Sequence, residues 1–403
     1  MTARLLTNIG RLWTGSEILS NAAIVTSDDR IAWVGPAAEL PRSVPGAVDD
    51  IVDVDLVENL GGGLVTPGLI DAHTHPVYAG NRYAELNMRS SGTSPEEIAA
   101  AGGGIHATLT VTRGTDPWTL CNNVRERLGA WIQSGTTTIE AKTGYHLTRD
   151  GELAAVRMLR SLENESDMPR VHATLMAAHA VPPEYFGRRQ DYVEAVASWC
   201  PDAAAVGADG VDVDCRDGRF TEDEARWILG AARRSGLLAR VHASETNHSK
   251  TIQLAADLGC ASADLLNNVS EDDVSALARA GVASVVCPAI AIGHDAHPPV
   301  RSLLERGAVL GLGSGHTPGT VGITSMPLVI SLAVSYLGLS VAEALRAATL
   351  GGSQALHAAD RGTMEAGRYA DIVLWDADHE GAFAWDYALR PRRVWRGGEP
   401  VTA

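Results

Sequence analysis

The middle of the chain alternates short apolar runs with longer segments in which apolar residues recur every three or four positions. Runs of four to eight apolar residues bounded by turn residues are typical of buried strands, and amphipathic segments such as EDEARWILGAARRSG are typical of helices. Eight apolar runs meet the first description: GLVTPGLIDAH, TTTIEAK, RVHATLMAA, DGVDVDC, LARVHA, SADLL, ASVVCP and AVLGLGS. Eight alternations of strand and helix predict a closed parallel (β/α)8 TIM barrel of the α/β class.

Both ends of the chain differ from this middle. Residues 1–63 and 361–403 contain short strand-like runs separated by turn residues, such as AAIVTSDDRIAWVG and ADIVLWDAD. Because the two β-rich ends flank one long middle, we expect them to build one small β-sandwich domain together. The barrel domain is then expected over residues 64–360.

Composition narrows the range of partners. The chain has 49 acidic and 33 basic residues, a net charge of −16, which repels phosphate backbones and anionic lipids. We therefore expect neither nucleic acid nor membrane as a partner, whereas a local arginine or histidine cluster still admits a small anionic substrate. The five cysteines are scattered without a CxxC pair, and no apolar stretch reaches about 18 residues. These features predict a cytoplasmic protein with reduced thiols.

Polar residues follow several of the predicted strands at their carboxyl ends, where barrel enzymes carry their catalytic groups. The clearest case is Asp71-Ala72-His73-Thr74-His75 at the end of the first run. Positions i and i+2 of an extended backbone point the same way, so both imidazoles are expected to face the barrel mouth. His242 ends a later run in RVHASE. Since neutral imidazole is a common zinc ligand, His73, His75 and His242 are predicted to bind one divalent metal ion, zinc or alternatively iron. The competing interpretation is histidines that only bond neighbouring loops.

The segment PGLIDAHTH is similar to the metal-binding signature of the amidohydrolase superfamily. Six further segments make almost the whole chain resemble the imidazolonepropionase family: AHTHPVYAGNRYAEL, GGGIHATLTVTR, GTTTIEAKTGYHL, MAAHAVPPEY, VHASE and TPGT. The resemblance implies a metal-dependent hydrolase that opens a cyclic amide C–N bond in an imidazolone-type ring. It also implies a small, carboxylate-bearing heterocyclic substrate and a homodimer.

The resemblance further implies roles for single residues. Arg82 and Tyr145 would contact the substrate carboxylate or ring, His179 would hydrogen-bond the ring, and Glu245 would activate or position the attacking water. Lys142 matches a lysine of the family, and we expect it to form an internal ion pair rather than a carbamylated ligand. Each side chain has an ordinary alternative: a solvated charge for Arg82 and Glu245, and packing for Tyr145 and His179.

The chain departs from the family after the eighth run. The family has a metal-binding aspartate there, which acts as general base, shortly before an Asn-Pro-Gly-Thr stretch. Alignment on Pro318-Gly319-Thr320 puts Gly315 at the aspartate and Thr317 at an asparagine that contacts the ring. His316 is a candidate replacement ligand or catalytic group, and Leu265 stands where the family has a histidine. Losing one general base typically slows a reaction about 10²–10⁴-fold.

These departures keep two alternatives open. The scaffold is also compatible with non-hydrolytic chemistry on a related small ring, such as cyclisation, decarboxylation or a lyase or isomerase step, because a fold does not determine a reaction. The other alternative is a non-catalytic protein that binds a small molecule.

Overall fold

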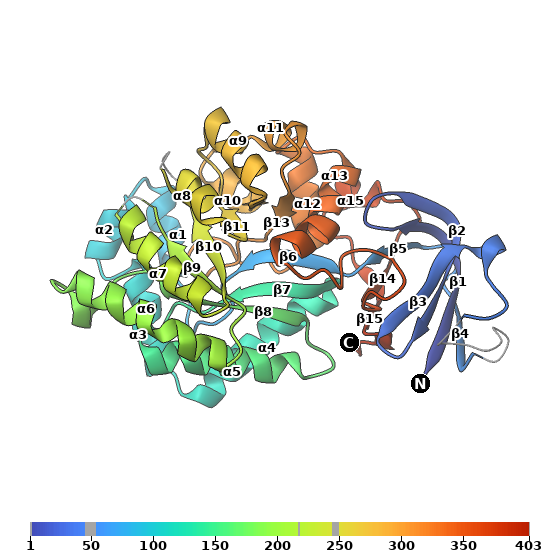
Figure 1. The fold of residues 1–403 in the computed structure, drawn as a ribbon, viewed down its shortest axis with the longest axis horizontal. Coiled ribbons are helices and arrows are strands. Elements are labelled where there is room, and N and C mark those ends of the chain that lie inside the picture. Colours follow the sequence, from blue (N-terminus) through green and yellow to red (C-terminus); the bar gives the residue numbers. More distant parts are fainter. Residues whose placement is uncertain (1, 45–53, 217, 244–249, 403) are drawn as a thin grey trace.

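The eight predicted strands form one parallel sheet that curls into a barrel (Figure 1). The computed structural model describes residues 2–44, 54–216, 218–243 and 250–402. Each barrel strand pairs with the next one along the chain. In chain order they are β6 Leu69–Thr74, β7 Thr136–Lys142, β8 Arg170–Ala178, β9 Gly210–Asp214, β10 Leu238–His242, β11 Ser262–Asp264, β12 Ala283–Val286 and β13 Leu310–Leu312.

The barrel closes between β6 and the loop that follows β13. Thr74 forms a parallel bridge with His316. The His75 N–H donates to the His316 carbonyl at 2.8 Å, and the Gly315 N–H donates to the His73 carbonyl at 3.1 Å. The closure therefore lies at the carboxyl end of the strands, beside two of the predicted metal ligands.

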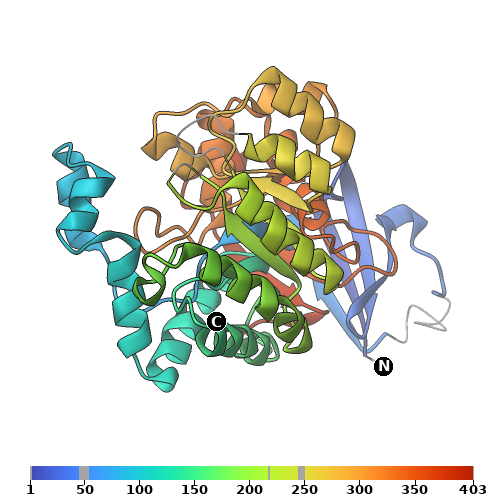
Figure 2. The ribbon, with the colours of Figure 1, turned by 60° about the vertical axis from the view of Figure 1, so that its left-hand side comes forward.

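Helices cover the outside of the barrel, and α1 to α3 (light blue to cyan in Figure 2) form an arm at one side. Several helices start at a capping box. At α7, for example, the Thr221 hydroxyl accepts from the Glu224 N–H, and the Glu224 carboxylate accepts from the Thr221 N–H. The helices are α1 Tyr83–Ser90, α2 Pro95–Ala100, α3 Gly104–Gly114, α4 Pro117–Gln133, α5 Arg149–Glu163, α6 Arg189–Ala205, α7 Glu222–Arg234, α8 Thr251–Leu258, α9 Glu271–Ala280, α10 Pro288–Gly293, α11 Val300–Glu305, α12 Met326–Ser335, α13 Val341–Arg346, α14 Gly352–Ala355 and α15 Ala382–Trp385.

The two ends of the chain build a separate mixed sheet, as predicted, in the order β16-β15-β14-β5-β1-β2-β3 with β4 beside β1. Its strands are β1 Ala3–Trp13, β2 Ile18–Ser27, β3 Arg30–Pro36, β4 Leu56–Asn59, β5 Leu64–Pro67, β14 Ile372–Trp375, β15 Pro391–Arg396 and β16 Glu399–Pro400. The first predicted run, GLVTPGLIDAH, forms two strands, since Leu64–Pro67 pairs within this sheet and Leu69–Thr74 within the barrel. The run breaks at Gly68, where a Cβ atom would lie 1.9 Å from Oγ1 of Thr137.

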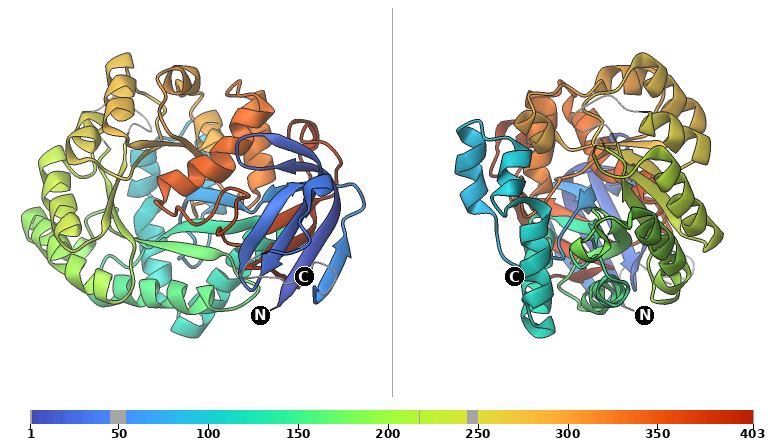
Figure 3. Two further views of the ribbon diagram at one scale, coloured as in Figure 1. Left: turned by 45° about the vertical axis from the view of Figure 1, so that its right-hand side comes forward. Right: turned by 90° about the vertical axis from the view of Figure 1, so that its left-hand side faces the viewer.

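The small sheet packs against the barrel and shares its hydrophobic core (Figure 3). Val373 and Trp375 of β14 lie in the same buried cluster as Leu69 of β6. The Arg170 guanidinium at the start of β8 also pairs with Asp371 at 2.8 Å. The exact division into a terminal domain and a barrel domain stays a prediction.

Two expectations from composition can be compared with the structure. All five cysteines lie in the described part of the chain, and none forms a disulfide. Among the described residues, no helix is both long enough and apolar enough to cross a bilayer.

Candidate metal centre and active site

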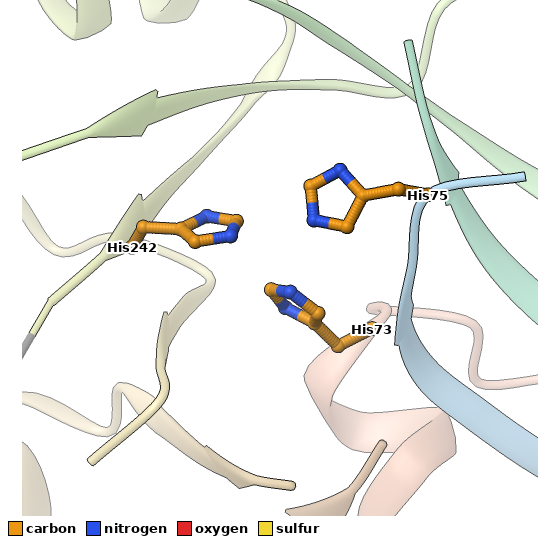
Figure 4. A group of neighbouring side chains, drawn as sticks. All are labelled: His73, His75 and His242. Carbon is orange, nitrogen blue, oxygen red and sulfur yellow. The ribbon is translucent and has the colours of Figure 1, made fainter. Parts of the chain in front are cut away.

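Three histidines converge at the carboxyl end of the barrel (Figure 4). His73 and His75 come from β6 and the residue just after it, and His242 ends β10. One ligand atom of each lies within 4.8 Å of the other two, and all three side chains are buried. The ring centroids of His73 and His242 are 4.6 Å apart. The structure thus brings together the three predicted metal ligands.

Carboxylates orient two of these imidazoles. The His73 Nδ1–H donates to Asp264 at 2.7 Å, and the His242 Nδ1–H donates to Asp212 at 2.9 Å. A proton held at Nδ1 leaves Nε2 as the ligand atom, the usual arrangement around protein-bound metals. Burial lowers the pKa of His73 to about 3, so its ring is neutral at physiological pH, as a ligand must be. The buried Nδ1 of His75 has no hydrogen-bond partner. This donor set fits a divalent cation such as zinc.

Lys142 lies beneath the histidines and joins their carboxylates. Its Nζ is 2.7 Å from Asp212, 2.8 Å from Glu140 and 3.4 Å from Asp264, and all four side chains are fully buried. Burial opposes the charge on Lys142, but the three carboxylates raise its pKa above the ordinary value. The expected internal ion pair is confirmed. Because two of the carboxylates also bind the ligand histidines, Lys142 fixes the base of the metal centre.

Three buried aspartates that the sequence did not single out also belong to the site. Asp212 and Asp264 hold the ligand histidines, and Asp71 accepts from the Ser314 N–H at 2.8 Å and from the Trp131 indole at 2.9 Å. Burial raises the pKa of Asp71 to about 6. For Asp212 the available signal was the alternation in VDVD, which puts Asp212 and Asp214 on one face of a strand.

Three predicted substrate-binding residues meet at one side of the mouth. The Tyr145 hydroxyl is 3.1 Å from the Thr317 hydroxyl. Arg82 lies against the same loop, since a Cβ atom on Gly319 would be 2.5 Å from its Cζ. Glu85 accepts from Arg82 at 2.9 and 2.8 Å, an ion pair that the sequence did not predict. Burial raises the pKa of Tyr145 to about 12, so its hydroxyl keeps its proton.

His179 lies between the metal ligands and Tyr145. Its ring stacks on His75 with centroids 5.3 Å apart, and the Tyr145 ring is 5.2 Å away. The Nδ1–H donates to the Gly144 carbonyl at 3.1 Å, which leaves Nε2 as an acceptor. Burial lowers the pKa of His179 to about 3. The side chain is therefore a neutral hydrogen-bond acceptor beside the metal centre.

One further candidate from the sequence, His316, is not brought to the three histidines. His316 donates from Nδ1 to the Ile323 carbonyl at 3.2 Å, and its Nε2 accepts from the Tyr78 hydroxyl at 3.1 Å. Its ring packs against Trp131, with centroids 4.9 Å apart. With both nitrogens bonded there, His316 contributes no atom to the ligand group. Glu245 lies outside the described residues.

Comparison with known proteins adds to this geometry. A sequence model of the amidohydrolase family matches residues 64–401. The chain belongs to the amidohydrolase family. Three similar relatives all carry the name imidazolonepropionase. The protein of Rhizorhabdus wittichii is 36% identical over 402 residues, covering 98% of each chain. That of Anaeromyxobacter sp. is 39% identical over 92% of this chain and 88% of its own, and that of Pseudomonas aeruginosa is 37% identical over 95% and 94%.

Solved structures agree with this amidohydrolase at the level of the fold. The A. niger ochratoxinase superposes with a TM-score of 0.74 at 19% identity, covering 100% of this chain and 96% of that one. A variant of atrazine chlorohydrolase from Arthrobacter aurescens, in complex with zinc and atraton, gives 0.76 at 17% identity over 98% and 94%. The barrel with a terminal sheet is therefore an architecture that this family shares with solved hydrolases.

Proposed function

We propose that this amidohydrolase is a metal-dependent hydrolase that opens a cyclic amide C–N bond in an imidazolone-type ring. The observation that carries the proposal is the cluster of His73, His75 and His242 at the barrel mouth, two of them oriented by buried carboxylates. Relatives of 36–39% identity over nearly the whole chain are named imidazolonepropionase, which favours hydrolysis over the non-hydrolytic and binding-protein alternatives.

The remaining pocket groups suit a small ring that carries a carboxylate. Arg82 supplies the positive charge, and Tyr145 and Thr317 supply hydroxyl donors beside it. His179 offers Nε2 to an N–H of the ring. These contacts hold the ring at the histidine cluster, so that the bond to be broken is presented in one orientation.

Proton transfer is the step in which this chain departs from its family. When bound, a divalent ion in such a centre polarises a carbonyl and lowers the pKa of water. In the family, an aspartate after β13 takes up a proton. In this chain Gly315 stands at that position, and it has no side chain that could accept one. We propose that Glu245 and His179 share this task. His316, also a candidate from the sequence, has its Nε2 bonded to the Tyr78 hydroxyl, and we therefore do not assign it this task.

The proposal includes finer features. We propose zinc as the ion, a homodimer as the assembly and the cytoplasm as the location. Within the described residues the ligand group consists of three histidines, as in catalytic zinc sites, and the unpaired cysteines agree with a reducing compartment. Metal analysis and light scattering of the purified protein test the first two.

The direct test is incubation of the metal-replete protein with imidazolonepropionate while the ring absorbance is followed. We expect ring opening that stops when a chelator removes the metal and returns when zinc is restored. A metal-replete protein that leaves the ring intact would favour the non-hydrolytic alternative.

A first prediction concerns Tyr145. The substitution Tyr145→Phe removes the hydroxyl next to Thr317. It is expected to raise KM about 10- to 100-fold with little change in kcat, because a hydrogen bond to a charged group contributes about 1.5–3 kcal/mol. Steady-state kinetics measure both constants. The control is Tyr387→Phe, which changes an exposed tyrosine far along the chain. An unchanged KM would place Tyr145 outside the substrate contacts.

A further inference from the structure

The adjacent strands β11, β12 and β13 end differently from the strands that carry the histidines. Leu265 directly follows β11, Cys287 directly follows β12, and Ile290 lies in the first turn of α10. These three residues form one buried cluster, with Val321 of the loop after β13 packed against it. We call Leu265, Cys287 and Ile290 the aliphatic wall. One arc of the barrel mouth is thus polar and ligating, and the neighbouring arc is apolar.

The aliphatic wall fills the space that a side chain at position 315 would need. A Cβ atom on Gly315 would lie 2.5 Å from Cδ1 and 2.8 Å from Cγ1 of Ile290, and 3.2 Å from Cβ of Cys287. Real Cβ atoms do not approach other atoms this closely. The position where the family carries a carboxylate is therefore not an empty cavity but is occupied by Ile290.

The wall lies directly beside a metal ligand. The Gly315 N–H donates to the His73 carbonyl at 3.1 Å. A Cβ atom on Gly313 would be 2.7 Å from Cβ of His73 and 3.1 Å from the sulfur of Cys287. Through Gly313 and Gly315 the wall therefore packs against His73, one of the three clustered histidines.

The backbone at Leu265 supports a specific role for this wall. Its φ is +62°, a left-handed conformation that is rare for leucine. The preceding residue, Asp264, bonds His73, so the strained position is tied to the metal centre. Strained residues that the surrounding structure holds in place are concentrated at functional sites.

We propose that the aliphatic wall is a specificity element, which selects a ring bearing a hydrocarbon substituent on the edge that faces Leu265 and Ile290. This inference rests on the proposed function and deepens it. A small alkyl group on that edge leaves water and contacts Leu265 and Ile290, which is favourable. A polar or charged group there would lose its hydration without gaining a hydrogen bond from these side chains. The substrate class is then an alkyl-substituted, carboxylate-bearing imidazolone-type ring.

The experiment compares two probes, imidazolonepropionate and an analogue with a methyl group on a ring carbon. For the wild type we expect kcat/KM for the methylated ring to exceed that for the parent about fourfold, the effect of one buried methylene-sized group. Ile290→Ala should bring the ratio towards one and improve turnover of a propyl analogue, with Ile290→Val in between. Calorimetry with the two ring-opened products gives a second comparison, the ratio of Kd for the parent product to Kd for the methylated product.

Ile292 of the same helix supplies a matched control. Its side chain is 41% exposed, so Ile292→Ala should leave every ratio at the wild-type value. If both rings are opened equally well by the wild type and by Ile290→Ala, the wall does not contact the substrate and this inference fails, while the proposed function stands. If neither ring is opened, the proposed function fails, and the calorimetric ratios alone support or overturn the wall.

A second test addresses the volume at position 315. Gly315→Asp alone should lower Tm by about 2–4 °C without tightening metal binding, because Ile290 occupies the space of the new carboxylate. Gly315→Asp combined with Ile290→Ala should lower the metal Kd at least tenfold in a chelator competition. It should regain only part of the lost Tm, because the φ of +68° at position 315 strains any residue with a side chain. Tighter metal binding by the single variant would show that Ile290 does not fill the position and would overturn the inference.

Discussion

His242→Ala is expected to abolish stoichiometric metal binding and to lower kcat/KM at least about 10³-fold. Only three described side chains form the ligand group, so the loss of one leaves two imidazoles, too few to hold a catalytic zinc ion. The substitution also leaves Asp212 without its imidazole partner beside Lys142. Metal lowers such barriers by several kcal/mol, and each 1.36 kcal/mol is about tenfold in rate.

Metal content by mass spectrometry and kcat/KM on the imidazolone ring are measured on the same preparation. His379→Ala is the matched control, because the side chain of His379 is 62% exposed and lies outside the cluster. It should keep one metal ion per chain and full activity. A His242→Ala protein that retains metal and turnover would show that the three histidines are not the centre.

Local sequence patterns were enough to predict the barrel and the group of three histidines at its mouth. A buried strand can be predicted from its own apolar run. Two histidines at positions i and i+2 face the same way in any extended segment. Both signals lie within a few residues, so His73 and His75 could be placed before the fold was known. The pattern was insufficient at Leu64–Pro67, because a continuous apolar run does not reveal that the chain changes sheets at Gly68.

What the sequence could not predict depends on contacts between distant segments. Asp212 orients His242 only because β9 and β10 pair in one register, with Arg240 opposite Asp212. The orientation of His316 depends on the left-handed turn at Gly315 and on Tyr78, more than 200 residues earlier in the chain. The filling of the glycine position by Ile290 likewise joins two separate loops. All three contacts depend on side-chain positions that a local sequence pattern cannot predict.

Lys142→Met is expected to destabilise the fold by about 3–5 kcal/mol and to lower Tm by about 5–10 °C. The substitution leaves Glu140, Asp212 and Asp264 buried without the cation that neutralises them. Lys250, the only other lysine in the chain, is exposed and supplies the matched control. Lys250→Met should leave Tm within about 1 °C of the wild type, because surface substitutions rarely exceed about 0.5 kcal/mol.

The pH dependence of unfolding identifies the cause of this loss. Burial raises the pKa of Asp264, but Lys142 and His73 lower it to about 2, below its unfolded value of about 3.9. This carboxylate therefore stabilises the wild type at every pH above about 4, and its contribution is lost only as the pH falls towards 2. Without Lys142, the hydrogen bonds from His73 and His242 remain, but the lysine charge no longer opposes burial. We therefore expect the folded pKa values of the buried carboxyls, most clearly that of Glu140, to lie above the unfolded ones. The Lys142→Met variant should then gain stability between pH 7 and pH 5, where this term leaves the wild type unchanged, as urea unfolding at each pH can measure. A variant whose deficit stays constant over that range would attribute the loss to packing rather than to unpaired charge.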